Sequence, residues 1–452
     1  MYDFAVVGNG LIGSAAAKYL VRQTGDADIV LIGPERREES KIFDCHDDEA
    51  RICRRLDVDD VWAELATRSM ARYNEIQKES GIQFHYPCGC LAVGRRGGTY
   101  LNAVSACAAR QGVPLKALSE AELKSHWPEL RLDATLLRDF DERSDDKKGC
   151  STHFVEESDE EKHIEYAALY EEGPAGHISP TNFLRAQLLL FTRLGGHYVH
   201  GVVERLSKDD DCWKVDLGAG KNIFAKKVLV ATNAWTNFRP LLKHKLALTL
   251  TTQTAMRRRV RSSNIKIPAI IVRAGSNQFG SSASFLDACY FLPPVNYDND
   301  DQWVKIGHGT YFERPLASEE EAIAWYQGYE AERADCYARC DLSALLQRLC
   351  GNLIIKDNDF TKPHTIPIKC VIPKTPSKRP YLAYFDQGLV ACVGCNGYAA
   401  KSSDELGRLS ALLLLHNNRE PFDFGPNIPP DAFDPIFATP ATAEDHDDRS
   451  RR

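Results

Sequence analysis

The stretch FAVVGNGLIG at residues 4–13 decides the fold. Its first half is an apolar run typical of a strand buried on both faces, and its second half places glycines at positions 8, 10 and 13. Apolar residues then recur at helical spacing, and a second buried strand is predicted at 29–32. Strand, glycine turn, helix and strand within about 30 residues form the βαβ unit that binds a dinucleotide.

The three glycines have separate physical roles. Gly8 permits the tight turn out of the strand, Gly10 lets the backbone approach a pyrophosphate, and Gly13 lets helix and strand pack closely. The helix that follows presents free N–H groups and the positive end of its dipole to the phosphates. We therefore expect the dinucleotide to contact Gly8, Gly10, Leu11, Ile12 and Gly13.

A carboxylate is expected about 20 residues after the glycine loop, where it binds a ribose hydroxyl. The second strand ends in Ile32-Gly33-Pro34-Glu35, so position 33 does not supply it. We assign the ribose role to Glu35. The alternative is that Glu35 is a surface charge after a turn.

The composition is that of a globular protein that can bury a large core. The 452 residues are 43% apolar and 26% charged, and the formal net charge is −7. These values exclude disorder of the whole chain and argue against nonspecific binding to nucleic acid or anionic membranes, which needs a basic face. No run of ~18 apolar residues is present, and the first residues do not resemble a secretory signal. We expect a cytoplasmic protein without nucleic-acid or membrane partners.

The fourteen cysteines are irregularly spaced and form no zinc-finger pattern. We therefore expect no metal site. Most of these cysteines should be reduced and should pack as small hydrophobic residues.

Segments far apart in the sequence have the character of one nucleotide-binding sheet. A buried strand at 228–232 ends at Asn233-Ala234-Trp235. A last strand at 389–393 meets a third glycine turn, GCNG at 394–397, before a predicted helix at about 402–415. A sheet assembled from three distant segments suits an enzyme that buries an extended FAD better than a compact nicotinamide domain.

Five landmarks, in order, resemble the D-amino-acid oxidase superfamily, in the branch of monomeric sarcosine oxidase, N-methyltryptophan oxidase and pipecolate oxidase. They are the glycine loop, DDEARICR at 47–54, ATNAW at 231–235, VKIG at 304–307, and Cys370 with its Thr375-Pro376 and the later GCNGYAAK at 394–401. The resemblance extends from residue 2 to about residue 415. The chain departs from the family pattern at Asp48-Glu49-Ala50, at Asn233 and at Gly309.

The resemblance implies an α/β fold with two domains. A Rossmann-like FAD-binding domain is assembled from the discontinuous segments 1–82, 173–240 and 366–425. A mixed-sheet α+β substrate domain takes 83–172 and 241–365. Residues 139–172 are interpreted as an acidic surface insertion and 426–452 as a loose tail, because they are rich in charge, proline and alanine.

The resemblance also assigns residues to the cofactor. Val203 would meet the adenine through its backbone, Arg51 would serve the flavin face, and Cys370 would form a thioether with the flavin ring. The alternative for Cys370 is a plain buried cysteine. The remaining expected cofactor contacts are Trp235, Gly394 and Gly397.

Oxidation of an amine next to a carboxylate needs fixed cations that hold the carboxylate. The resemblance gives this role to Arg54 and Lys401, and it places Lys305 over the flavin. A fixed positive charge at that place stabilises superoxide during the reaction with O₂. The alternative at each position is an ordinary solvent-facing residue.

We therefore expect a monomeric FAD-dependent oxidase that removes a hydride from an amino acid, with a secondary or N-alkyl amine favoured. The product is an imine, and O₂ is reduced to H₂O₂. One alternative is a flavin dehydrogenase of the same fold that uses another electron acceptor. A second is a non-catalytic dinucleotide-binding scaffold. The side chain of the substrate stays open.

Overall fold

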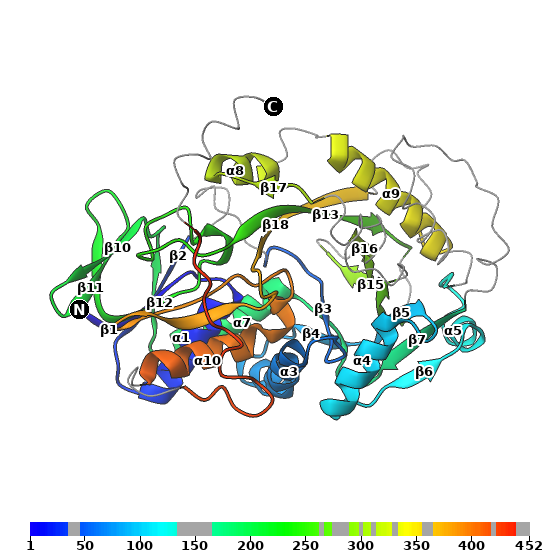
Figure 1. Cartoon of the computed structure of the whole chain (residues 1–452), viewed down its shortest axis with the longest axis horizontal. Coiled ribbons are helices and arrows are strands. Elements are labelled where there is room, and N and C mark those ends of the chain that lie inside the picture. Colours follow the sequence, from blue (N-terminus) through cyan, green and yellow to red (C-terminus); the bar gives the residue numbers. More distant parts are fainter. Residues whose placement is uncertain are drawn as a thin grey trace.

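The computed structural model describes residues 1–34, 46–132, 165–261, 266–273, 289–297, 302–308, 313–327, 333–354, 365–416 and 422–439, with the backbone alone at 308 and 333–341. The described residues form two α/β units that lie side by side along the long axis (Figure 1). Each unit is built around its own large sheet. The predicted α/β fold with two domains is therefore confirmed.

The first sheet gathers strands from distant parts of the chain. In spatial order they are β10 (Arg205–Asp209), β11 (Cys212–Asp216), β12 (Asn222–Val230), β1 (Tyr2–Val7), β2 (Ile29–Gly33) and β9 (His197–His200), with β20 (Leu389–Val393) beside β12 and β19 (Tyr381–Asp386) beside β20. Strands β9, β2, β1, β12 and β20 pair in parallel. Their carboxyl ends therefore meet at one edge, where open sheets of this kind bind ligands.

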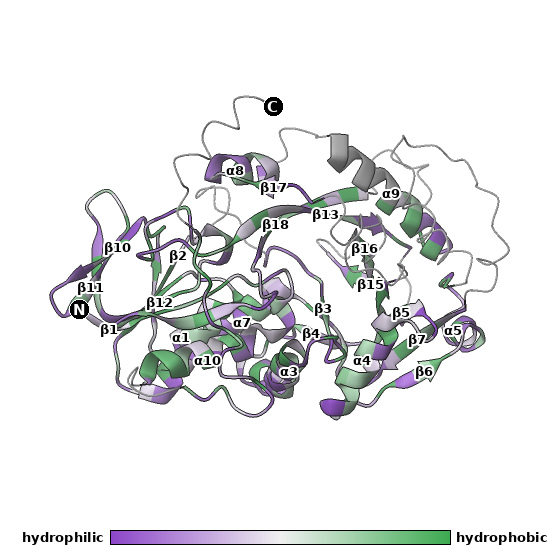
Figure 2. Cartoon of the chain, viewed as in Figure 1, coloured by the Kyte–Doolittle hydropathy of each residue, from purple (hydrophilic) through white to green (hydrophobic). Residues whose placement is uncertain are grey.

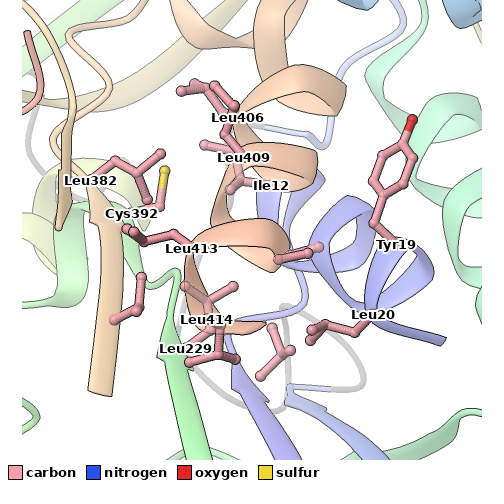
Figure 3. Packing of buried hydrophobic residues seen from close by; sticks show 14 of the residues in the cluster. Ile12, Tyr19, Leu20, Leu229, Leu382, Cys392, Leu406, Leu409, Leu413 and Leu414 are labelled. Carbon is pink, nitrogen blue, oxygen red and sulfur yellow. The ribbon is translucent and has the colours of Figure 1, made fainter. Parts of the chain in front are cut away.

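Helices α1 (Leu11–Thr24) and α10 (Ser403–Leu415) cover one face of this sheet, with α7 (Pro180–Arg193) and α3 (Asp60–Ser80) beside them (Figure 1). Figure 3 shows leucines of α10 meeting Ile12 and Leu20 of α1 above Leu229 of the sheet. An ion pair also joins α1 to α10. Lys18 Nζ lies 2.8 Å from Asp404 Oδ1, and both side chains are fully buried. These contacts hold the start of α1, which follows the glycine loop, against the sheet and α10.

The second sheet forms the other unit. In spatial order its strands are β17 (Pro315–Leu316), β13 (Thr249–Arg259), β16 (Gln302–His308), β15 (Cys289–Asn296), β14 (Ala269–Arg273), β5 (Cys90–Arg95), β7 (Tyr166–Glu171) and β6 (Lys116–Leu118), with β18 (Thr365–Lys374) beside β13. One face packs on α9 (Arg333–Cys350) and α5 (Glu120–His126). The opposite face packs on α4 (Thr99–Arg110) and looks toward the first unit.

Short elements connect the two units. A small sheet joins β3 (Arg51–Cys53), β8 (Gly176–Ile178) and β4 (His85–Pro87), and two 3₁₀ turns, η2 (Asn233–Trp235) and η3 (Ala399–Ser402), lie near the edge of the first sheet. Figure 2 shows apolar residues concentrated in the central strands and polar residues on α8 (Glu319–Gln327) and around β10 and β11. Among the described residues, no helix is both long and apolar enough to cross a membrane.

Two strands differ from the sequence-based expectation. Residues 365–374 form β18, which pairs with β13 along its whole length, so they belong to the second sheet and not to the last FAD-binding segment. Residues 166–171, expected in a surface insertion, form β7, because the side chains of Tyr166 and Ala168 are buried in the core. Residues 139–164 of that expected insertion lie outside the described residues.

The expected loose tail is packed where it is described. Phe433 is 1% exposed and joins the same apolar cluster as α1 and α10. Its carbonyl accepts a hydrogen bond of 3.0 Å from Leu382 N. Burial of Ile428, Ala432 and Phe433 therefore holds this part of the tail against the first unit.

Candidate active site

The glycine loop after β1 has the geometry of a phosphate cradle. Gly8 has a φ of +107°, and a Cβ there would lie 2.6 Å from Ala231 O. A Cβ on Gly13 would lie 1.8 Å from Gly8 O, so neither position tolerates a side chain. A Cβ on Gly10 would meet nothing within 4 Å, and no side chain caps α1 at this residue. The open space and the first amides of α1 therefore fit the pyrophosphate of a dinucleotide.

The other predicted cofactor turns lie at the same edge of the sheet. Cys395 N donates to Asn233 Oδ1 at 3.2 Å, which joins the turn after β20 to η2 after β12. Asn233 has a φ of +46°, so asparagine adopts the left-handed conformation at the position where the family carries glycine. The remaining predicted cofactor residues are described as follows. Leu11 and Ile12 are the first residues of α1. Val203 and Trp235 are buried, and Gly394 and Gly397 both have a positive φ. Glu35, the predicted ribose ligand, lies outside the described residues.

Arg54 and Lys401 are brought together from opposite ends of the chain by one carboxylate. Asp57 Oδ2 accepts from Arg54 Nη1 at 2.7 Å and from Lys401 Nζ at 2.6 Å. All three side chains are at most 9% exposed. We call these residues the Asp57 cluster. It is a buried arrangement of two cations around one carboxylate.

The charges of the Asp57 cluster stabilise one another. Burial opposes ionisation of Asp57, but Arg54 and Lys401 more than offset this effect and hold the pKa of the carboxyl well below its usual value. Burial and the like charge of Arg54 lower the pKa of Lys401, whereas Asp57 acts in the opposite direction. The two cations therefore need an anion between them, and Asp57 supplies one.

Neighbouring elements fix the position of the Asp57 cluster. The buried carboxylate of Glu171, at the end of β7, accepts hydrogen bonds of 2.9 Å from the backbone N–H groups of Arg55 and Leu56. Tyr73 Oη on α3 donates to Lys401 O at 2.6 Å. The second sheet thus holds the loop that carries Arg54 and Asp57, and α3 holds the turn that carries Lys401.

Arg51 and Lys305 meet on a second aspartate. Asp48 Oδ2 is bonded to both Lys305 Nζ and Arg51 Nη1, and Asp48 Oδ1 accepts from Tyr297 Oη at 2.7 Å. The Asp48 and Lys305 side chains are 1% exposed, whereas that of Arg51 is 20% exposed. We call Asp48, Arg51, Lys305 and Tyr297 the Asp48 cluster.

Cys370 lies at the margin of the Asp48 cluster. Arg51 Nη2 is 3.8 Å from Cys370 Sγ, and the cysteine is reduced and partly exposed. Burial raises the pKa of Tyr290 to about 12; the charge of Arg51 opposes this shift, whereas Cys370 and Cys289 add to it. The strand register places Tyr290, Cys370 and Lys305 on the same face of the second sheet.

The four predicted cationic site residues thus fall into two groups that β3 connects. Arg51 opens β3 and belongs to the Asp48 cluster with Lys305, close to Cys370. Arg54 follows β3 directly and belongs to the Asp57 cluster with Lys401.

Sequence reasoning missed the residues that hold these cations in place. The spacing of Arg54 and Asp57, three residues apart, was a local signal for their ion pair. Asp48 was visible only as a departure from the family pattern. Tyr297 and Glu171 had no signal in the sequence, because their partners lie far away along the chain.

Solved structures of flavoenzymes have the same fold. NikD, described as an unusual amino acid oxidase essential for nikkomycin biosynthesis, matches with a TM-score of 0.68 and 17% identity over 97% of this chain and 98% of that chain. Glycine oxidase from Geobacillus kaustophilus matches with a TM-score of 0.63 and 16% identity over 94% and 97%. L-proline dehydrogenase from P. horikoshii matches with a TM-score of 0.63 and 15% identity over 91% and 92%.

Sequence similarity to curated proteins is local. The N-methyl-L-tryptophan oxidase of Yersinia pestis (strain Pestoides F) is 25% identical over 147 residues. That match covers 32% of this chain and 38% of the length of the relative.

The sequence profile of one family covers almost all of the chain. It is described as FAD dependent oxidoreductase and matches residues 3–413. The match includes the glycine loop, both aspartate clusters and Cys370. The protein is thus a member of the FAD dependent oxidoreductase family.

Proposed function

We propose that this protein oxidises the amine of an amino acid or a related carboxylate, with a secondary or N-alkyl amine favoured. The Asp57 cluster is the observation that carries the proposal. Arg54 and Lys401 hold a carboxylate there, at 2.7 and 2.6 Å, as an amino-acid substrate would need to be held. The names of two similar proteins, N-methyl-L-tryptophan oxidase and the amino acid oxidase NikD, support the same class of substrate.

The residues present fit FAD. Gly8, Gly10 and Gly13 would hold its pyrophosphate, because two of these positions exclude side chains and the third faces open space. Arg51 and Cys370 would face its ring system. FAD, when bound, accepts a hydride from the carbon next to the amine.

The chain's own part in the reaction is to orient the substrate. Arg54 offers a planar fork and Lys401 a point charge, and both lie in a buried site where charge interactions are strong. Asp57 keeps both cations in place before the substrate arrives, which lowers the cost of ordering them. The substrate carboxylate would share the two cations with Asp57 or displace it.

The proposal includes O₂ as the electron acceptor. Two electrons and two protons leave the amine, which becomes an imine, and reduce O₂ to H₂O₂. Lys305 would supply the positive charge that favours negative charge on O₂. The expectations of a monomeric and cytoplasmic enzyme are part of the same proposal.

An anaerobic titration tests the proposal. The purified holoprotein would be mixed with N-methylglycine, L-pipecolate or L-proline while the flavin absorbance near ~450 nm is recorded. Loss of the flavin band with at least one of these amines, followed by stoichiometric H₂O₂ on admission of air, is the expected result. A flavin that none of them reduces would remove the proposed substrate class.

Acid precipitation tests the covalent link through Cys370. A yellow pellet from the wild type and a yellow supernatant from Cys370→Ser would support a thioether at this residue. Cys212→Ser, at another partly exposed reduced cysteine, is the matched control. Flavin in the supernatant of the wild type would remove the link and leave FAD bound without it.

One observation favours a dehydrogenase as a second candidate. The ammonium of Lys305 is bonded to the buried carboxylate of Asp48, a residue that stands where the family pattern has glycine. This carboxylate offsets the charge that would favour reduction of O₂. Stopped-flow reoxidation of the reduced flavin by O₂ and by a soluble quinone separates the two functions. A dehydrogenase would react slowly with O₂, and Asp48→Asn would accelerate that reaction roughly tenfold; an oxidase would react fast without the substitution.

A further inference from the structure

Arg257 carries a half-buried charge for which the described residues offer no anion. Its guanidinium lies over the ring of Tyr297, at 4.5 Å from the centroid, and over that of Trp303, at 5.1 Å. Its Nε atom is buried and has no hydrogen-bond partner among the described residues. Arginine stays charged inside proteins, and a buried donor without a partner is costly. A ligand that accepts a hydrogen bond from this guanidinium would remove that cost.

The strand register places Arg257 at the candidate active site. Arg257 on β13 is paired directly with Lys305 on β16, so both side chains leave the same face of the sheet. Tyr297 connects Arg257 to the Asp48 cluster, because its ring lies under the guanidinium and its hydroxyl donates to Asp48 Oδ1 at 2.7 Å. Arg257 thus lies beside the Asp48 cluster, on the strand next to the one that carries Lys305.

The neighbouring carboxylates are already engaged with other groups. Asp48 is bonded to Arg51 and Lys305, and Glu49 accepts from Ser179 Oγ. In each aspartate cluster one carboxylate faces two cations, so each cluster keeps one positive charge. Arg257 adds a further positive charge to the same face. A substrate with a single carboxylate, held by Arg54 and Lys401, would leave Arg257 without a counter-ion.

We propose that Arg257 forms a second anion-binding subsite, and that the preferred substrate is an N-alkyl amino acid with an additional carboxylate on its side chain or N-substituent. The two aromatic rings hold the plane of the guanidinium, and its N–H edge can grip both oxygens of a carboxylate. The identity of the substrate rests on the proposed amine oxidation. The anion subsite itself rests on the surroundings of Arg257.

Two measurements on the holoprotein test the subsite. The first is equilibrium binding, from the perturbation of the flavin spectrum, of the dicarboxylates malonate to adipate, each compared with its half-amide. The second is kcat/KM for N-methyl-L-aspartate and N-methyl-L-glutamate, each compared with its side-chain amide. Each acid has nearly the same size as its amide, so the comparison isolates the second charge. We expect the acid to be preferred by about 10- to 100-fold in both measurements.

Variants identify the residue responsible. Arg257→Gln should abolish the preference for the acid over the amide, and Arg257→Lys should restore part of it. Arg273→Gln is the matched control. Arg273 also lies over a tyrosine, Tyr100 at 5.1 Å, and its buried Nε has no hydrogen-bond partner within the described part of the chain. Arg273 is on β14, however, away from β13 in the order of the sheet. The preference should persist in this variant.

The outcomes separate the subsite from the proposed function. Equal binding of dicarboxylate and half-amide by the wild type, or a preference that survives Arg257→Gln, would overturn the subsite even if N-methyl amino acids reduce the flavin. A preference for dicarboxylates that depends on Arg257, together with a flavin that no amine reduces, would support the subsite and overturn the amine oxidation.

Discussion

The Asp57 cluster and the Asp48 cluster have the same core, an aspartate between an arginine and a lysine, but different surroundings. In the Asp57 cluster all three side chains are at most 9% exposed. In the Asp48 cluster the arginine is 20% exposed and lies 3.8 Å from the sulfur of Cys370. The same charges therefore suit two uses, an enclosed carboxylate anchor and a charged group beside the proposed ring of the cofactor.

The difference arises from the elements that supply the lysines. Lys401 comes from η3, next to the turn after β20 and the edge of the first sheet. Lys305 comes from the middle of β16 in the second sheet. Because β3 runs between these sites, its two ends carry one arginine to each of them.

Removal of a cation from the Asp57 cluster should have the largest effect on activity. Arg54→Met and Lys401→Met each delete a charged contact to the substrate carboxylate and leave Asp57 with one cation. We expect kcat/KM to fall roughly 100-fold or more in each variant. Lys227→Met is the control, because Lys227 is a partly buried lysine that bonds Leu414 O, outside both clusters. A similar loss in the control would refute the anchoring role.

Neutralising the aspartate of each cluster should lower the free energy of unfolding by different amounts. Asp57→Asn leaves two enclosed cations without their anion, so the free energy of unfolding should fall by about 3–5 kcal/mol. Asp48→Asn should cost less, about 1–3 kcal/mol, because water can reach Arg51 and Lys305 keeps a contact of 3.3 Å to Ala50 O. Urea unfolding of both variants measures the difference. A larger loss for Asp48→Asn would contradict the distinction between an enclosed and an open cluster.

Acid should destabilise the strand that connects the clusters. His177 on β8 pairs with Ile52 of β3, and burial lowers the pKa of His177 from 6.5 to about 4. As the pH falls, the unfolded chain binds the proton first, so stability is present above pH 6.5 and is lost as the pH approaches 4. This histidine should account for a loss of about 2 kcal/mol between pH 7 and pH 5.

The variant His177→Gln tests this pH dependence. Its free energy of unfolding should change less between pH 7 and pH 5 than that of the wild type. His126→Gln, at an exposed histidine of α5, should leave the pH dependence unchanged. If His177→Gln keeps the wild-type dependence, another group is responsible for it.

Local patterns predicted the parts of the fold that local physics determines. The alternation of apolar runs and glycines at 4–13 and the helix that follows predicted β1, α1 and β2, because turns and helices depend on neighbouring residues. The pattern at 365–374 could not tell which sheet the strand joins, since pairing with β13 is a contact between distant segments. The packing of the tail could not be predicted for the same reason, because its buried side chains contact the distant helices of the first unit.

The candidate site was predictable only in part. The resemblance to a family supplied Arg51, Arg54, Lys305, Cys370 and Lys401 as positions, without their partners. Asp48 and Asp57 decide which of these cations lie together, and their contacts join residues as distant as Lys401 and Asp57, 344 positions apart. Single-sequence patterns do not reach over such separations.

The most direct test of the carboxylate anchor is a comparison of N-methylglycine with N-methylglycinamide in anaerobic reduction of the flavin. The two amines differ in the group that Arg54 and Lys401 would hold. If the Asp57 cluster is the anchor, the acid should reduce the flavin at least about 100-fold faster at low concentration, and Lys401→Met should remove most of this advantage. Equal rates for acid and amide, or an advantage that Lys401→Met does not change, would contradict it.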